Sequence, residues 1–215
     1  MGADDEKRAA AAAAAELVES GMRVGLGTGS TVAWLLPELA RRDVAARYVA
    51  TSPRTAEAAR QLGIVVGAFD DVDSLDLAID GADQVADDGW LIKGGGAAQT
   101  REKIVAAAAQ RFVVICDSSK LVAELHAPVP LELLAFGLAA TLRQLSPVTL
   151  RDVALSPDGG LIADYHGDVG DPAELAAWLS SVPGLVGHGL FGPEMVSQVL
   201  VGIDGTVRSI NGGKQ

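Results

Sequence analysis

The sequence predicts an α/β protein: a mostly parallel sheet with helices on both faces, followed by a smaller α+β unit. Three observations support this fold class. Up to about residue 126, short apolar strands alternate with helices, which is typical of parallel sheets. Beyond that point the expected order is strand–helix–strand–strand–helix–strand, the ferredoxin-like split unit. Near the end, Asp204 and Gly205 separate two apolar strands, a hairpin pattern that we expect to return to the first sheet.

In the first part, apolar runs and turn residues define the elements. Acidic residues at its start favour a helix over residues 4–19, because the helix macrodipole stabilises carboxylates there. The expected strands that follow are 22–26, 46–50, 64–68, 74–80 and 112–116, and the expected helices are 32–41, 54–62 and 97–110. The last of these helices begins just after three consecutive glycines.

In the second part, turn residues again separate the elements. The expected strands are 129–134, 148–154, 161–166 and 185–190, the helices are 136–145 and 172–182, and the hairpin strands are 196–203 and 207–210. Pro172 is well placed at the start of a helix. We therefore expect a larger domain made of residues 1–126 and 199–215, and a smaller domain made of residues 127–198.

Composition and charge exclude several classes of function. The 215 residues are 49% hydrophobic, which is enough for a sizeable core. The net charge of −11 argues against nucleic acid or an anionic membrane surface as partner, because both need a basic surface. No apolar run is long enough to cross a membrane, and the acidic start does not fit a secretory signal. With Cys116 as the single cysteine, no internal disulfide can form, and we expect a cytoplasmic protein.

The first motif is Gly-Leu-Gly-Thr-Gly-Ser-Thr at residues 25–31. It follows a strand and opens a helix, so backbone N–H groups and the helix N-terminus can hold an anion. Ser30 stands where a dinucleotide fingerprint needs glycine, no acid ends the next strand, and no Walker lysine follows. The motif therefore favours a single phosphate. A tight glycine turn without a ligand is the alternative.

The second motif is Asp80-Gly-Ala-Asp83, at the end of an apolar strand. Ligands of open α/β sheets bind at the carboxyl ends of the strands, so two carboxylates there can hold sugar hydroxyls. A metal site is weakly supported, because no histidine or further well-spaced acid accompanies the pair. An aspartate turn that closes the strand is the alternative.

The third motif is Lys93-Gly-Gly-Gly96, which leads into the helix that contains Glu102. The glycines allow a close approach to a ligand, and the lysine supplies a compact charge. The residues one turn from Glu102 are uncharged, so its carboxylate can be partly buried with the raised pKa that a proton-transfer base needs. A surface glutamate between Arg101 and Lys103 is the alternative.

The fourth motif is Asp117-Ser-Ser-Lys120, after the strand at 112–116. It places polar residues at another strand end, although a plain loop and helix start would look the same. Because the ends of parallel strands lie side by side, the four motifs can line one crevice. We treat Cys116 as a core residue. The three histidines, His126, His166 and His188, show no triad or metal spacing, and we treat them as structural.

On these residues, the chain resembles type A ribose-5-phosphate isomerase. The matching segments are 25–31, 51–52, 80–83, 91–97, 100–103, 117–120 and 189–191. The resemblance spans nearly the whole chain, and its block Lys-Gly-Gly-Gly…Thr-Arg-Glu-Lys is highly specific. It implies a Rossmann-like catalytic domain with a ferredoxin-like insertion, a homodimer or homotetramer, and no metal or organic cofactor. The implied reaction interconverts ribose 5-phosphate and ribulose 5-phosphate through an enediolate, in the non-oxidative pentose phosphate pathway.

The resemblance also implies roles for individual residues. Glu102 would move a proton between C1 and C2, Asp80 and Asp83 would bind hydroxyls and assist ring opening, and Lys93 would stabilise charge on oxygen. The implied substrate-binding residues are Thr28, Gly29, Ser30, Thr31, Asp80, Gly81, Ala82, Asp83, Lys93, Gly94, Gly95, Gly96, Lys120 and Lys7. Gln84 departs from the family, which usually has an acid there, and we expect it to support the loop rather than the chemistry.

Two other classes of function stay open at this point. One is a non-catalytic sugar-phosphate sensor that uses the phosphate loop without Glu102 as a base. A sensor of that kind usually has a DNA-binding segment, and we expect none here because neither end of the chain is basic or long enough. The other is a related enzyme, such as a coenzyme A transferase or a sugar-phosphate deaminase.

Overall fold

A six-stranded sheet forms the centre of the larger part of the molecule in this computed structural model, which describes residues 2–70 and 72–214. Its strands are β1 (Arg23–Leu26), β2 (Arg47–Ala50), β3 (Leu75–Gly81), β6 (Ala109–Asp117), β13 (Gln198–Ile203) and β14 (Thr206–Asn211). The order across the sheet is β14-β13-β6-β3-β1-β2, and its neighbours pair in parallel except in the β13–β14 hairpin. The structure therefore confirms the mostly parallel sheet and the return of the hairpin to it.

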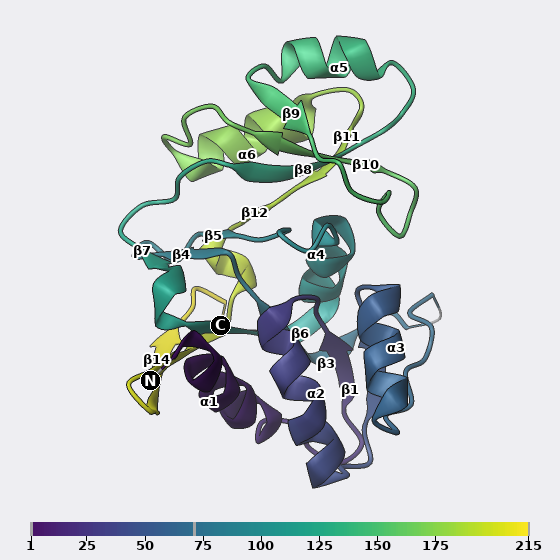
Figure 1. Cartoon of the computed structure of the whole chain (residues 1–215), viewed down its shortest axis with the longest axis vertical. Helices are drawn as coiled ribbons and strands as arrows, with labels where there is room; N and C mark the ends of the chain where they lie inside the picture. The colour runs from purple at the N-terminus through teal and green to yellow at the C-terminus, as the bar shows by residue number, and fades with distance from the viewer. Residues whose placement is uncertain (1, 71, 215) are drawn as a thin grey trace.

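Helices cover both faces of this sheet (Figure 1). They are α1 (Ala3–Ala15), α2 (Ser30–Arg42), α3 (Pro53–Gln61) and α4 (Gln99–Ala108). Buried residues of α1 and α2 share one core with Leu77 and Val113, whereas buried residues of α4 share the other with Ala78 and Val114. Since successive residues of a strand point to opposite faces, adjacent positions such as Leu77 and Ala78 enter different cores.

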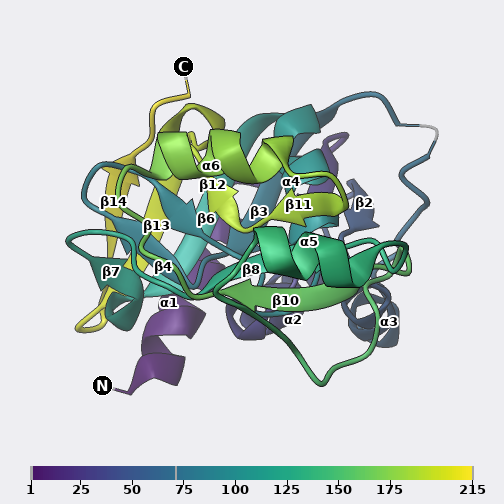
Figure 2. The same ribbon diagram turned by 90° about the horizontal axis from the view of Figure 1, so that it is seen from above.

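A second, antiparallel sheet forms the smaller unit, which lies above the large sheet in Figure 1. Its strands are β8 (Val129–Leu133), β9 (Val148–Leu150), β10 (Leu161–Tyr165) and β11 (Leu185–His188), and its helices are α5 (Leu138–Gln144) and α6 (Pro172–Ser181). The strand order is β11-β8-β10-β9, which confirms the ferredoxin-like unit. Seen from above, α5 and α6 lie in front of its strands (Figure 2).

A third sheet, which the sequence pattern does not predict, joins the two units. Its strands are β12 (Leu190–Phe191), β5 (Leu91–Ile92), β4 (Gln84–Ala86) and β7 (Leu121–Val122), in that order. Strands of two or three residues are too short to show an alternating pattern, which is why they were missed. This sheet matters for function because β5 ends directly before Lys93.

Several expected element bounds need correction. The expected strand over 64–68 does not form: Val66 makes a single bridge to Tyr48, and Val65 is exposed. The expected strand over 185–190 is divided at Gly189 into β11 and β12. Gly189 lies so close to the carbonyl of Lys93 that no larger side chain fits there. The first helix ends at Ala15 rather than at residue 19, and β9 ends four residues before the expected bound of 154.

The division into residues 1–126 with 199–215, and 127–198, stays a prediction, and residues 1, 71 and 215 of those ranges lie outside the described residues. In the part of the chain that the structure describes, the helices are all too short or too polar to cross a bilayer.

Candidate active site

A cavity of about 550 Å³ lies at the carboxyl ends of the central strands. The residues predicted for the site that line it are Thr28, Gly29, Ser30, Thr31, Gly81, Ala82, Asp83, Lys93, Gly94, Gly95, Gly96, Glu102 and Lys120. These residues come from all four motifs. The structure therefore brings the four strand ends into one crevice, where open α/β sheets bind their ligands.

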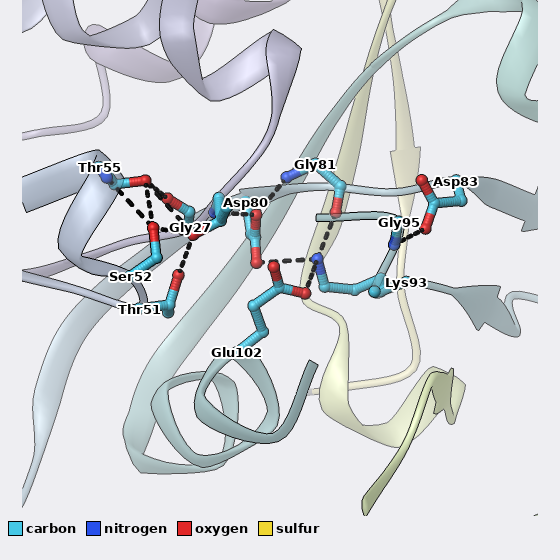
Figure 3. A network of polar contacts seen from close by, with 12 residues as sticks. Gly27, Thr51, Ser52, Thr55, Asp80, Gly81, Asp83, Lys93, Gly95 and Glu102 are labelled. Atoms are coloured by element: carbon cyan, nitrogen blue, oxygen red, sulfur yellow. Dashed lines mark hydrogen bonds and ion pairs between the residues drawn. The ribbon is translucent and has the colours of Figure 1, made fainter. Parts of the chain in front are cut away.

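Three charged side chains form a buried cluster beside this cavity (Figure 3). The Nζ atom of Lys93 lies 2.8 Å from a carboxylate oxygen of Asp80 and 3.1 Å from one of Glu102. It also donates a hydrogen bond of 2.5 Å to the carbonyl of Gly81. The side chains of Lys93 and Glu102 are each only 2% exposed. The ammonium group therefore lies within 3.1 Å of two carboxylates and a backbone carbonyl.

The carboxylate of Asp80 is held in position partly by the turn that follows β1. One of its oxygens accepts hydrogen bonds from the N–H groups of Thr28 at 3.0 Å and of its own neighbour Gly81 at 2.7 Å. At Gly27, a Cβ would overlap the carboxylate of Asp80, so only glycine leaves room for this approach. The glycine turn and the aspartate at the next strand end therefore depend on each other.

Burial and charge set the pKa values of this cluster. Burial, together with the nearby charge of Asp80, raises the pKa of Glu102 to about 8, although Lys93 acts in the opposite direction. Burial also raises the pKa of Asp80, against the opposing effects of Lys93 and the two backbone N–H groups. For Lys93, burial alone would lower the pKa, but the two carboxylates outweigh burial and raise it. We therefore expect a charged Lys93 and a Glu102 that gains or loses a proton near neutral pH.

Asp83 has a different environment from Asp80 although only three residues separate them. It is exposed, and its Oδ2 accepts a hydrogen bond of 2.7 Å from the N–H group of Gly95. Its own N–H group pairs with the carbonyl of Ile92 in the small joining sheet. Asp83 therefore connects the second motif to the glycine triplet of the third, as Figure 3 shows.

The N-terminus of α2 opens into the cavity. The backbone of Gly29 has a φ of +141°, which favours glycine, and no side chain caps this helix end. Ser30 and Thr31 form its first turn, and no acidic residue is present there. Free N–H groups and the positive end of the helix macrodipole make this end suited to an anion such as phosphate.

A group of hydroxyls near this helix was missed as a functional feature. The Oγ1 atom of Thr28 lies 2.7 Å from the hydroxyl of Ser52 and 2.9 Å from that of Thr51, and Thr55 joins the same group. Ser52 and Thr55 line the cavity, as does the exposed Arg54. The available signal was the polar end of the second strand, Thr51 and Ser52, to which no role was given.

Three residues singled out from the sequence are not among the described residues that line the cavity: Asp80, which belongs to the buried cluster, Lys7 and Gln84. Lys7 lies on α1, where its ammonium group is 3.5 Å from the carboxylate of Asp4. Gln84 points to the connection between the two units, where its amide accepts from the N–H group of His126 at 2.9 Å and donates to its carbonyl at 2.8 Å. The amide thus makes a pair of backbone hydrogen bonds that a carboxylate could not make.

The described residues contain no cluster of three or more histidine, cysteine or acidic side chains arranged to hold a metal ion. The acids of the site contact a lysine and backbone N–H groups instead. The chemistry that this arrangement offers is proton transfer by a carboxylate, next to backbone N–H groups and a buried positive charge.

Known proteins are similar in sequence to this chain over nearly its whole length. Residues 47–205 match the family model described as ribose 5-phosphate isomerase A (phosphoriboisomerase A). The ribose-5-phosphate isomerase A of Caulobacter sp. (strain K31) is 46% identical, over 95% of this chain and 96% of that protein. That of Roseiflexus castenholzii (strain DSM 13941 / HLO8) is 44% identical, over 94% of this chain and 93% of that protein.

Solved structures share the fold as well. Ribose 5-phosphate isomerase A from Methanocaldococcus jannaschii superimposes with a TM-score of 0.90 at 34% identity, over 95% of this chain and 97% of that chain. A D-ribose-5-phosphate isomerase in complex with phospho-erythronic acid gives a TM-score of 0.92 at 32% identity, over 98% of this chain and 100% of that chain. This chain therefore belongs to the ribose 5-phosphate isomerase A family.

Proposed function

We propose that this chain interconverts D-ribose 5-phosphate and D-ribulose 5-phosphate, with Glu102 as the base that moves a proton between C2 and C1. The observation that supports this role most directly is the position of the Glu102 carboxylate. It is buried, reaches the same cavity as both glycine-rich loops, and lies 3.1 Å from Lys93. With its pKa raised to about 8, it can both accept and return a proton near neutral pH.

The reaction begins with the open-chain aldose. Glu102 takes the proton from C2, the electron pair of that bond forms the C1–C2 double bond, and the C1 carbonyl oxygen becomes an enediolate oxygen. The hydroxyl proton on O2 then leaves as the C2 carbonyl forms, the same glutamic acid returns its proton to C1, and O1 is protonated. Asp83, which is exposed at the cavity, is the group that we assign to the proton exchange between the two oxygens.

Lys93 balances the charge of this proton transfer. With both carboxylates ionised, the cluster of Asp80, Lys93 and Glu102 has a net charge of −1. When Glu102 becomes protonated, that charge moves to the enediolate oxygen while Lys93 and Asp80 stay paired at 2.8 Å. A buried ammonium group next to the new negative charge stabilises it more than water would, because the site is desolvated. Of the two carboxylates expected to bind sugar hydroxyls and assist ring opening, Asp83 lines the cavity, whereas Asp80 is 4% exposed and holds Lys93 in this scheme.

The phosphate of the substrate binds away from the reacting carbons. We assign it to the free N-terminus of α2 at Ser30 and Thr31, with Lys120 as the nearby positive charge of the same cavity. A local cationic site is needed because the whole chain has a net charge of −11. Binding energy from the phosphate then positions C1 and C2 at Glu102. Lys7, paired with Asp4, is a weaker candidate for this role.

Some expectations about the whole protein rest on the sequence composition and on the family. These are a cytoplasmic location, a place in the pentose phosphate pathway, and assembly into a homodimer or homotetramer. Light scattering on the purified chain would measure the last of these.

The test of the function is direct. Purified protein should convert ribose 5-phosphate to ribulose 5-phosphate, and reaction in D2O should place deuterium at C1 of the ketose. Deuterium at C1, even in part, would support proton transfer through a base, whereas product without solvent deuterium together with full activity of Glu102→Gln would point to a hydride shift and refute Glu102 as the base. A protein that binds the sugar phosphate but forms no ketose would be a sensor, and turnover only with a coenzyme A ester or an amino sugar phosphate would indicate a related enzyme.

A further inference from the structure

Arg151 of the smaller unit holds the glycine triplet of the active-site cavity. It directly follows β9, and its Nε and Nη2 atoms donate to the two carboxylate oxygens of Asp164 on β10, at 2.7 and 2.6 Å. Its Nη1 atom donates to the carbonyl of Gly94 at 3.0 Å and lies 3.4 Å from that of Gly95. One side of the guanidinium group therefore binds Asp164 in the small domain, and the other side binds the glycine loop.

These contacts determine where the loop N–H groups point. In a trans peptide, the N–H group lies opposite to the carbonyl of the same peptide plane. With the carbonyl of Gly94 directed to Arg151, the N–H group of Gly95 is directed away from it and reaches Asp83 at 2.7 Å. By the same geometry, the carbonyl of Gly95 directs the N–H group of Gly96 away from Arg151. Gly95 and Gly96 are exposed and line the cavity.

The loop needs such a contact because its own sequence leaves it flexible. Three consecutive glycines lose more conformational freedom on folding than other residues would. Gly94 has a φ of +107° and Ala97 a φ of +60°, so the segment is in the left-handed region at both ends. Its internal support is one turn hydrogen bond, from the N–H group of Ala97 to the carbonyl of Gly94 at 3.0 Å.

The ion pair between Arg151 and Asp164 is more buried than a typical surface ion pair. The side chains of Arg151 and Asp164 are 18% and 17% exposed, and the pair is bidentate, which fixes the plane of the guanidinium group. In Figure 1, the loop between β5 and α4 lies between the small unit and the large sheet. The small unit thus supplies a rigid support to a loop of the catalytic crevice.

We propose that Arg151, held by Asp164, is a positioning residue through which the small domain keeps residues 94–96 in the conformation that binds the reacting end of the substrate. This deepens the proposed isomerase function and rests on it. It also gives the small domain a role in the reaction itself, since loss of the guanidinium contact leaves the loop carbonyls free to turn into the cavity.

A nearby ion pair provides a matched control. Arg101 of α4 and Asp158 of the small unit also form a bidentate pair across the same junction, with both distances 2.7 Å. This pair is more exposed, at 36% and 49%, and it does not contact the glycine triplet. Asp158→Asn therefore weakens the junction without releasing the loop.

The experiment compares Arg151→Ala with Asp158→Asn at a temperature at which both are folded. For Arg151→Ala we expect kcat/KM to fall about 10- to 100-fold, since a misplacement of about 1 Å can cost a factor of that size. Most of the loss should appear in kcat, because the phosphate site at α2 is untouched. Hydrogen exchange of the amides of residues 95–97 should become faster. Asp158→Asn should leave the kinetics and this exchange close to wild type.

Three results would overturn the inference: kcat/KM of Arg151→Ala within twofold of wild type, unchanged exchange in residues 95–97, or an equal loss in Asp158→Asn. If Arg151→Ala does not fold, the isosteric Asp164→Asn variant loosens the same guanidinium and should show smaller changes in the same direction. Hydrogen exchange reports loop positioning without any substrate. An inactive wild-type protein would therefore refute the proposed function, whereas normal exchange in the variant would refute the role of Arg151.

Discussion

The two glycine-rich loops line one cavity but obtain their geometry from different parts of the chain. The loop after β1 is held by its neighbour in the same sheet: Gly27 donates to the carbonyl of Ile79 at 2.9 Å, and Thr28 donates to Asp80. The loop after β5 is held by Asp83 and by Arg151, which is 57 residues away from Gly94. The conformation of the first loop depends on contacts within the parallel sheet, whereas that of the second depends on contacts between the two units.

This difference explains what each loop can do. A loop fixed by its own sheet presents a constant helix N-terminus, which suits a phosphate that does not change during the reaction. A loop fixed by a second unit can respond to that unit, and it lines the same cavity as Lys93 and Glu102, the groups to which we assign the reaction. We expect changes around the second loop to affect turnover and changes around the first to affect folding and binding.

The largest effect is expected at the helix that follows the second loop. Glu102→Gln keeps the shape of the side chain and removes the base, so kcat should fall by about 10²–10⁴. Steady-state assays of ketose formation measure this loss, and circular dichroism verifies the fold. Glu124→Gln, a change at an exposed glutamate, is the control and should keep full activity. Near-normal turnover of a folded Glu102→Gln protein would remove Glu102 from the mechanism.

The second test puts an alanine into each loop. In Gly27→Ala, the new methyl group overlaps the buried carboxylate of Asp80, and we expect a loss of about 1–3 kcal/mol in unfolding free energy together with low activity. In Gly95→Ala, the methyl group would lie 2.6 Å from an oxygen of Asp83, an exposed side chain that can rotate away. Urea unfolding should therefore show a smaller loss for Gly95→Ala. Equal losses would mean that the two loops are equally rigid.

The pH dependence tests the buried cluster. Because the base must be ionised and burial raises the pKa of Glu102 to about 8, kcat/KM should rise with pH up to about pH 8, close to tenfold per unit on the acid side. A flat profile between pH 6 and pH 9 would show that Glu102 is ionised throughout.

The same pKa shift has a consequence for stability. The folded pKa of Glu102 lies above its unfolded value of 4.5, so the folded protein keeps a proton that the unfolded chain releases. This contribution to stability is fully present below pH 4.5 and is lost as the pH rises to about 8. The wild-type protein should therefore lose stability relative to Glu102→Gln across this window, which urea unfolding at several pH values would show.

The smallest effect on activity is expected at Gln84, which follows Asp83 in the chain and binds His126. In Gln84→Glu, a carboxylate oxygen replaces the amide that donates to the carbonyl of His126, and two acceptors then face each other. We expect a loss of about 1–3 kcal/mol in unfolding free energy, with little change in kcat. Gln110→Glu, at an exposed position, is the control. A Gln84→Glu variant as stable as the control would show that the amide hydrogen bond is not needed.

Much of the site was predictable because its signals are local. The alternation of strands and helices, the glycine turn at residues 25–31, and the acids at strand ends are all patterns within a few residues. They predict a shared crevice because parallel strands end at one edge of a sheet. The resemblance then implied which residues are catalytic, and the structure places Glu102 within 3.1 Å of Lys93.

By itself, the sequence determined most of the order of the elements, the family, and many of the residues that line the crevice. Only the tertiary structure decided how these residues are paired: Lys93 binds Asp80 and Glu102 rather than Asp83, Gln84 binds His126, and Arg151 holds the glycine triplet. It also decided that two-residue strands join the two units. The physical reason is distance along the chain. Periodicity and turn preference act over a few residues, whereas a contact such as that of Arg151 with Gly94, 57 positions apart, depends on how whole sheets pack.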